Sequence, residues 1–85
     1  MKLPVRKQYG NFHIIAGSFR LQENSLKLIS QLKEKGFIEA RQVGVNKFGL
    51  LQVAYNSYDT VEEARLALSN IRLNEDTSAW LLIKN

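Results

Sequence analysis

The sequence lacks cysteine, has a single proline, and contains no apolar stretch long enough to cross a membrane. Without cysteine, neither a disulfide nor a thiolate metal site can hold the fold together, so burial of apolar side chains must do so within 85 residues. Metal-ligand spacing is also absent, and the first residues lack the apolar run of a signal peptide. We therefore expect one small domain with no cofactor, no metal and no membrane contact of its own. Any targeting segment would lie outside this sequence.

Positive charge is concentrated at the start of the chain. The net charge is +4, but Lys2, Arg6 and Lys7 supply +3 of it within residues 1–10, where there is no acid. The rest of the chain is nearly neutral, whereas a duplex-binding domain usually carries a basic stripe on its folded surface. We predict a basic flexible tail or linker over residues 1–10, a folded domain over 11–85, and no nucleic-acid partner.

The chain repeats itself at a constant offset, which places Ile15 on Ala54. At this offset, residues 15–19 (IAGSF) align without a gap with residues 54–58 (AYNSY). The match continues through the pairs Glu23/Glu62, Ser30/Ser69 and Ala40/Ala79. Neither half is large enough to bury an apolar face alone, so the two halves must share one core.

Periodicity within each half predicts a strand, a helix and a second strand. Strands are expected over residues 11–19, 40–45, 50–58 and 79–84, and helices over 22–35 and 61–72. Gly36 is placed to end the first helix, with Phe37 folding back as the apolar contact of the cap. The second helix opens on Thr60 and Glu63, the pattern of a capping box, whereas the first opens on Leu21 and has no such cap.

The predicted order βαββαβ favours an α+β, ferredoxin-like split βαβ sandwich, with a four-stranded antiparallel sheet and both helices on one face. Strand alternation then assigns the two faces of the sheet. The residues expected to meet the helices are Phe12, Ile14, Ala16, Leu51, Val53, Tyr55, Leu81 and Ile83. The residues expected on the open face are His13, Ile15, Gly17, Leu50, Gln52, Ala54, Asn56, Trp80 and Leu82. The strand over 40–45 is ambiguous, because Ala40 and Val43 have opposite parity and a bulge can intervene.

The open face is the functional clue. Apolar side chains on a bare sheet, with Gln52, His13 and Arg41 nearby as polar contacts, are typical of a binding surface. The apolar members are Ile15, Leu50, Trp80 and Leu82.

Three segments follow one another along the chain: residues 12–19 (FHIIAGSF), 52–58 (QVAYNSY) and 79–82 (AWLL). Together with Gly36-Phe37 and Glu62-Glu63-Ala64, they resemble the SPOR (sporulation-related repeat) domain. The resemblance covers residues 11–84. It implies the same βαββαβ fold and a non-catalytic module that binds peptidoglycan, specifically glycan strands without stem peptides, along the sheet face. It also implies a place in the periplasmic part of the bacterial cell envelope, often at the division septum, within a larger protein.

The resemblance carries the first-strand binding motif onto Ile15, Gly17 and Ser18, and aromatic contact positions onto Trp80 and Leu50. The sequence departs from the family at Ile15, where a glutamine is common, and at Asn56, where a glycine is common. The predicted glycan-binding residues are therefore His13, Ile15, Gly17, Ser18, Arg41, Leu50, Gln52, Asn56, Trp80 and Leu82, and no residue is predicted to be catalytic.

Simpler interpretations stand beside these roles. Trp80 can cover a sheet edge, Arg41 can be a solvated edge charge, and Ser18 and Ser57 can bond their own backbone at equivalent bends. His13 is better interpreted as a strand residue than as a catalytic base, since no partners for a triad are placed near it.

Other functions use the same face. An RNA-binding domain shares the topology but would place aromatic residues on the two central strands, where this sequence has none exposed. A protein-interaction module or weak homodimer would pair the apolar face with a partner. An acylphosphatase-like enzyme would need an anion-binding loop, for which 17–20 (GSFR) is a thin match.

Overall fold

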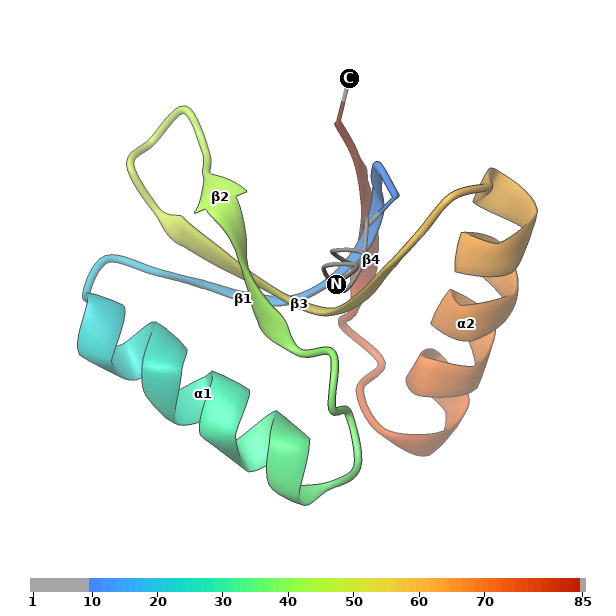
Figure 1. Cartoon of the computed structure of the whole chain (residues 1–85), viewed down its shortest axis with the longest axis horizontal. Helices are drawn as coiled ribbons and strands as arrows, with labels where there is room; N and C mark the ends of the chain where they lie inside the picture. The colour runs from blue at the N-terminus through green and yellow to red at the C-terminus, as the bar shows by residue number, and fades with distance from the viewer. Residues whose placement is uncertain (1–9, 85) are drawn as a thin grey trace, which may run out of the picture.

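The computed structural model describes residues 10–84 and has the predicted element order. The elements are β1 (Phe12–Phe19), α1 (Gln22–Glu34), β2 (Arg41–Val45), β3 (Leu51–Tyr58), α2 (Val61–Asn74) and β4 (Trp80–Ile83). The strands form one antiparallel sheet in the order β2-β3-β1-β4, so the first strands of the two halves lie at its centre. Both helices lie on the same side of this sheet (Figure 1). The predicted α+β fold is confirmed.

The internal repeat extends to the boundaries of the elements. The first residues of β1 and β3, of α1 and α2, and of β2 and β4 are all separated by the same offset that relates Ile15 to Ala54. The order β2-β3-β1-β4 places the central strand of each half beside the edge strand of the other half. The two halves are therefore equivalent in space as well as in sequence, and they share one core.

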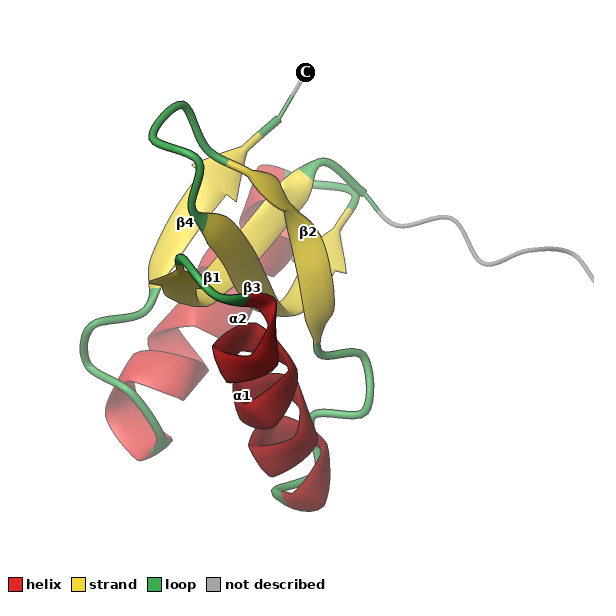
Figure 2. Cartoon of the chain, turned by 90° about the vertical axis from the view of Figure 1, so that its left-hand side faces the viewer, coloured by secondary structure: helices red, strands yellow, loops and turns green. Residues whose placement is uncertain are grey.

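The core lies between the sheet and the two helices, which Figure 2 shows below the strands. Its buried members come from the sheet, from both helices and from the residues just before β2 and β4: Ile14, Leu32, Ala40, Val53, Tyr55, Ala64, Ile71 and Ala79. Phe12, Ala16 and Leu81 pack against this cluster, as predicted, and Ile83 lies at the exposed end of the edge strand instead. Burial on this scale stabilises the fold by about 25 cal/mol for each square ångström of apolar surface removed from water.

The helix ends follow the sequence signals. Gly36 adopts a φ of 105°, which only glycine tolerates easily, and Phe37 N–H donates to the carbonyl of Leu32 at 3.0 Å to close α1. Phe37 then packs edge-on against Tyr55 with ring centroids 4.8 Å apart. At the start of α2, Thr60 Oγ1 accepts from the backbone N–H of Glu63 at 3.2 Å, whereas Leu21 makes no side-chain cap for α1.

The central strands carry the same bulge twice. Ala16 has no partner between the pairs Ile15–Ala54 and Gly17–Val53, and Tyr55 has none between Ile15–Ala54 and Ile14–Asn56. Ala16 and Tyr55 are equivalent positions of the repeat. Because a bulge puts two successive side chains on one face, it reverses the alternation beyond it.

A third irregularity falls in β2. Val43 is skipped between the pairs Gln42–Val53 and Gly44–Gln52, which is the bulge that the parity of this strand allowed. Gln42, which pairs with the core residue Val53, faces α1, where its side-chain oxygen accepts from Ser25 Oγ at 3.2 Å.

The predicted basic tail over 1–10 falls, apart from Gly10, outside the described residues. Within residues 10–84, neither helix is long and apolar enough to cross a bilayer.

Candidate binding face

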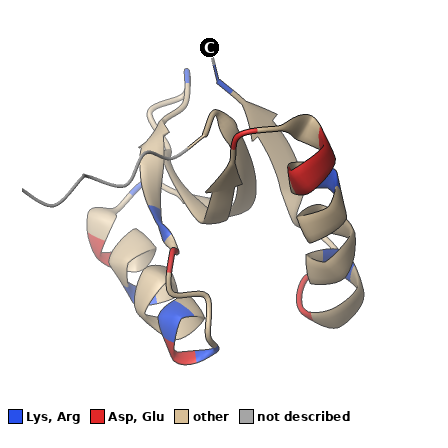
Figure 3. Cartoon of the chain, turned by 45° about the vertical axis from the view of Figure 1, so that its right-hand side comes forward, with Lys and Arg blue, Asp and Glu red and all other residues tan. Residues whose placement is uncertain are grey.

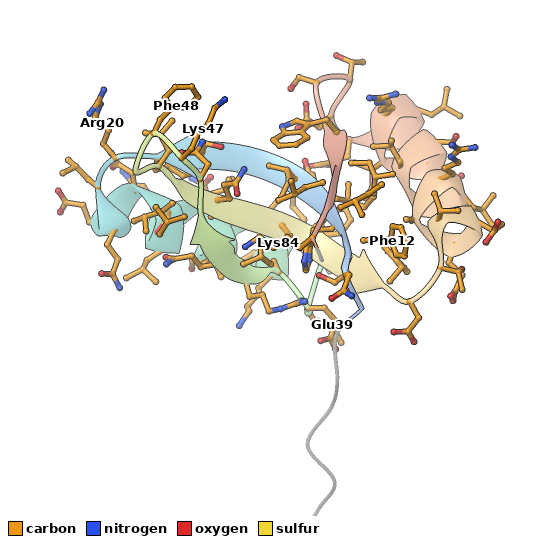
Figure 4. The ribbon with its side chains drawn as sticks, turned by 90° about the horizontal axis from the view of Figure 1, so that it is seen from above. Phe12, Arg20, Glu39, Lys47, Phe48 and Lys84 are labelled. Carbon is orange, nitrogen blue, oxygen red and sulfur yellow. The ribbon has the colours of Figure 1, made fainter. Side chains whose placement is uncertain are left out.

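The sheet face opposite the helices is concave. The sheet is strongly curved, so that β2 and β4 rise on either side of the central strands (Figure 1), and Figure 4 looks down onto this concave face. One row of paired residues runs across it from edge to edge: Arg41 on β2, Ala54 on β3, Ile15 on β1 and Trp80 on β4. The row has the symmetry of the repeat, since Arg41 is equivalent to Trp80 and Ala54 to Ile15.

Burial varies along this row of the concave face, which we call the groove. Ile15 and Ala54 at its centre are fully buried, whereas Trp80 at one edge is 41% exposed. Trp80 pairs with Ile15, which is not part of the cluster beneath the helices, so the indole lies on the solvent side of the sheet as predicted. The expectation that Ile15 is open to solvent is wrong: Ile15 is fully buried and forms the floor of the concave face instead of a surface contact.

The remaining predicted residues on the face occupy its floor and walls. Leu82 pairs with His13, and Ser18 pairs with Gln52, while Leu50 lies half-buried where the hairpin enters β3. His13 and Gln52 are buried, so the floor is more enclosed than a bare sheet would be. The bulge at Ala16 brings Ser18 to this face, where simple alternation along β1 would turn it toward the helices.

Two predicted residues do not lie on this face. A side chain at Gly17 would approach the ring of Phe19 and Leu28 of α1 at 3.1–3.3 Å, so this position points toward the helices. Asn56 lines a hollow of about 290 Å³ on the helix side, together with Phe37 and Ile71. Gly17 and Asn56 are equivalent positions, and the repeated bulge turns both of them away from the groove.

A polar network joins three strands across the face. Arg41 Nη2 donates to Ser57 Oγ at 2.5 Å, and Ser57 Oγ lies 2.5 Å from His13 Nδ1. A guanidinium can only donate, so the hydroxyl of Ser57 accepts from Arg41, and it shares a second hydrogen bond with His13 Nδ1.

The electrostatic environment of the face favours the neutral form of His13. Burial lowers the pKa of His13, and the charges of Arg41 and Lys84 lower it further. His13 is therefore neutral at pH 7 and serves to fix Ser57 and Arg41 in place. Arg41 Nη1 also donates to the backbone carbonyl of Glu39 at 2.9 Å, which further orients the guanidinium.

Lys84, which the sequence interpretation left out, connects the two edges of the sheet. Its Nζ donates to the backbone carbonyl of Val43 at 2.8 Å, from the end of β4 to the bulge of β2. Gly44 makes room for it, since a side chain there would meet the ammonium directly. Figure 4 shows Lys84 above the centre of the face.

Two further side chains complete the face. Ser57 is the counterpart of Ser18 in the second half of the repeat, and this equivalence was the signal that could have added it to the predicted site. Phe48, at the tip of the β2–β3 hairpin, is 71% exposed, and Lys47 Nζ lies 5.2 Å from the centre of its ring. Both residues of the hairpin tip are labelled at one end of the face in Figure 4.

Charged residues of both signs lie mainly on the helices and loops, and few lie on the strands (Figure 3). The strand residues that the register places on the concave face include Arg41 and no acid, and Lys84 follows them at the end of β4. Figure 3 shows the acidic residues on the helices and connecting loops instead. Among residues 10–84, no three carboxylate or imidazole side chains come together in a way that could hold a metal ion.

The family model of the SPOR domain matches residues 8–82, nearly the whole of the folded part. The chain therefore belongs to the SPOR domain family, as the sequence motifs indicated. Domains of this family are generally peptidoglycan-binding modules rather than enzymes, and they occur in envelope and division proteins. No curated protein and no solved structure matched the chain.

Proposed function

We propose that this domain binds peptidoglycan glycan strands that lack stem peptides, in the groove between Trp80 and Arg41, and thereby localises a larger protein in the periplasmic part of the bacterial envelope. The domain has no catalytic role in this proposal. Family membership supports peptidoglycan as the ligand. The observation that carries the choice of face is the half-exposed indole of Trp80 beside a fully buried floor.

The chemistry of the groove fits a bare glycan strand. Such a strand is a ribbon with apolar C–H faces on its sugar rings and polar groups along its edges. The flat indole of Trp80 covers a ring face at little cost in conformational entropy, because it has only two rotatable bonds. Ser18 and Arg41 offer a hydroxyl and a guanidinium to the polar edges.

The shape of the groove supports the preference for strands without peptides. β2 and β4 rise on either side of the central strands (Figure 1), so a ligand that contacts both Trp80 and Arg41 must span the row between these two edges. A stem peptide on every second sugar adds bulk that keeps the ribbon from lying between these edges. Concentration at the division septum follows in this proposal, if strands without peptides accumulate there.

RNA binding is the less favoured use of the face. Single-stranded RNA is held mainly by bases stacked on exposed aromatic rings of the central strands. Here the central strands present His13, Ile15, Gln52 and Ala54, all of them buried. A filter-binding assay with RNA oligomers at low salt separates the two functions, since glycan binding predicts no retention.

Sedimentation with purified sacculi tests the proposal. We expect the domain to sediment with sacculi after amidase treatment and much less before it. Trp80→Ala should weaken this binding at least about tenfold, which is roughly 1.4 kcal/mol. Leu73→Ala is the matched control, because Leu73 is an exposed apolar residue on α2, away from the groove. Equal binding by wild type and Trp80→Ala, or loss of binding in Leu73→Ala alone, would contradict the assignment of the face.

A further inference from the structure

We propose that Lys84 recognises the carboxylate that each muramic acid residue gains when its stem peptide is removed. This inference rests on the proposed function and adds the chemical group that the groove distinguishes. The stem peptide is attached through an amide to the lactyl side chain of the sugar. Hydrolysis of that amide consumes one water and leaves a carboxylate on the sugar and an amine on the released peptide. A bare strand is therefore a polyanion, whereas a peptide-bearing strand has a neutral amide at the same position.

The ammonium of Lys84 is held in place over the groove. Its bond to the Val43 carbonyl fixes the side chain across the concave face, from one edge strand to the other. Gly44 has a φ of 147°, a conformation that other residues rarely adopt, and it leaves open the space that the ammonium occupies. The local backbone of β2 is thus shaped to receive this side chain.

The ammonium retains donors for a ligand. It has three N–H groups, and within residues 10–84 the structure gives it one hydrogen bond, to the neutral carbonyl of Val43. Lys35, by contrast, pairs with the carboxylate of Glu75 at 2.6 Å. Lys84 instead keeps its charge uncompensated by any carboxylate of the described strands.

The electrostatic potential at the concave face favours the binding of an anion. The charges of Arg41 and Lys84 both act on the imidazole of His13, so the two cations bear on the same region of the groove. The strand residues of this face carry no negative charge of their own. An anion that enters the groove gains from the ammonium of Lys84, and partial burial strengthens this interaction relative to open solvent.

Binding of chemically matched glycans tests this inference. The ligands are amidase-treated glycan strands with free carboxylates, and the same strands with every carboxylate converted to a methylamide. We expect wild type to bind the free acid at least about tenfold more tightly than the methylamide. Lys84→Met, which keeps the length of the side chain without its charge, should bind both ligands equally and as weakly as wild type binds the methylamide.

Two further variants make the comparison specific. Lys84→Arg keeps the charge and should restore part of the preference for the acid. Lys27→Met removes a charge of the same type from the exposed part of α1 and should change nothing. Thermal unfolding of each variant reports on the fold, and the comparison of two ligands on wild type stands even if Lys84→Met does not fold.

The outcomes separate this inference from the proposed function. Equal binding of acid and methylamide by wild type overturns the role of Lys84 and leaves glycan binding intact. A preference for the acid that persists in Lys84→Met also overturns it, because another group then detects the carboxylate. No binding of either ligand by wild type overturns the proposed function itself.

Discussion

Ile15 and Trp80 are direct partners across β1 and β4, yet one is fully buried and the other is 41% exposed. Ile15 lies on a central strand and Trp80 on an edge strand, and the sheet curves so that β4 rises beside β1 (Figure 1). The same arrangement recurs on the other side, where the register pairs buried Ala54 with Arg41. An apolar floor between an indole and a guanidinium is the feature on which the functional account depends.

Protonation of His13 should destabilise the fold. In the unfolded chain the imidazole has its ordinary pKa of 6.5, whereas burial and the charges of Arg41 and Lys84 lower its pKa in the folded protein. As the pH falls below 6.5, the unfolded chain takes up a proton before the folded one does, so the free energy of unfolding decreases. The stabilisation is fully present above this pH and is lost as the pH falls toward the folded pKa.

Urea denaturation at a series of pH values between 8 and 5 measures this dependence, and the sole histidine can be titrated directly by NMR. His13→Gln is the control, because it removes the titrating group, and its stability should vary less over this range. An NMR pKa for His13 at or above 6.5 would contradict the network of Arg41, Ser57 and His13.

Gly17→Ala should affect stability and leave binding unchanged. The added methyl group would crowd Phe19 and Leu28 beneath the sheet, and overpacking of this kind costs about 1 kcal/mol when flexible side chains can adjust. Ser18→Ala is the matched substitution one residue later, on the groove side of the bulge. It should lower affinity for sacculi with little change in stability. If Gly17→Ala lowered the affinity and Ser18→Ala lowered only the stability, the position of the bulge at Ala16 would be contradicted.

The unequal helix caps allow the two halves to be compared. Thr60→Ala should lower the free energy of unfolding by about 1 kcal/mol, because the N–H of Glu63 loses its acceptor. Leu21→Thr should raise it by roughly 0.5–1 kcal/mol, since Leu21 occupies the equivalent position with extended φ and ψ and makes no cap. Chemical denaturation of both variants gives these differences, and a loss of stability in Leu21→Thr would show that the exposed leucine has a packing role.

Most of the fold could be predicted from the repeat and from periodicity. The constant offset between the two halves indicated the order of the elements, and the signals at Gly36 and Thr60 set helix boundaries that the structure confirms. These helix signals are local, because a glycine with positive φ or a capping hydroxyl acts on its own neighbours. Local signals of this kind can therefore be identified in a single sequence.

The binding face was harder to predict, because it depends on strand alternation over a distance. One extra residue at Ala16 and another at Tyr55 reverse the parity of everything beyond them, and this misassigned Gly17 and Asn56. Neither bulge has a strong sequence signal. The curvature that buries Ile15, and the contact from Lys84 to β2, result from pairing between distant strands, which the sequence does not display.

Fluorescence of Trp80 tests the central claim most directly, because it is the only tryptophan in the chain. Titration with short glycan strands free of stem peptides should shift the emission to shorter wavelength and saturate, since a sugar ring that covers the indole removes water from it. The same strands with intact stem peptides should leave the spectrum unchanged. An emission spectrum that does not respond to the bare strands, or that responds equally to both ligands, would contradict the account.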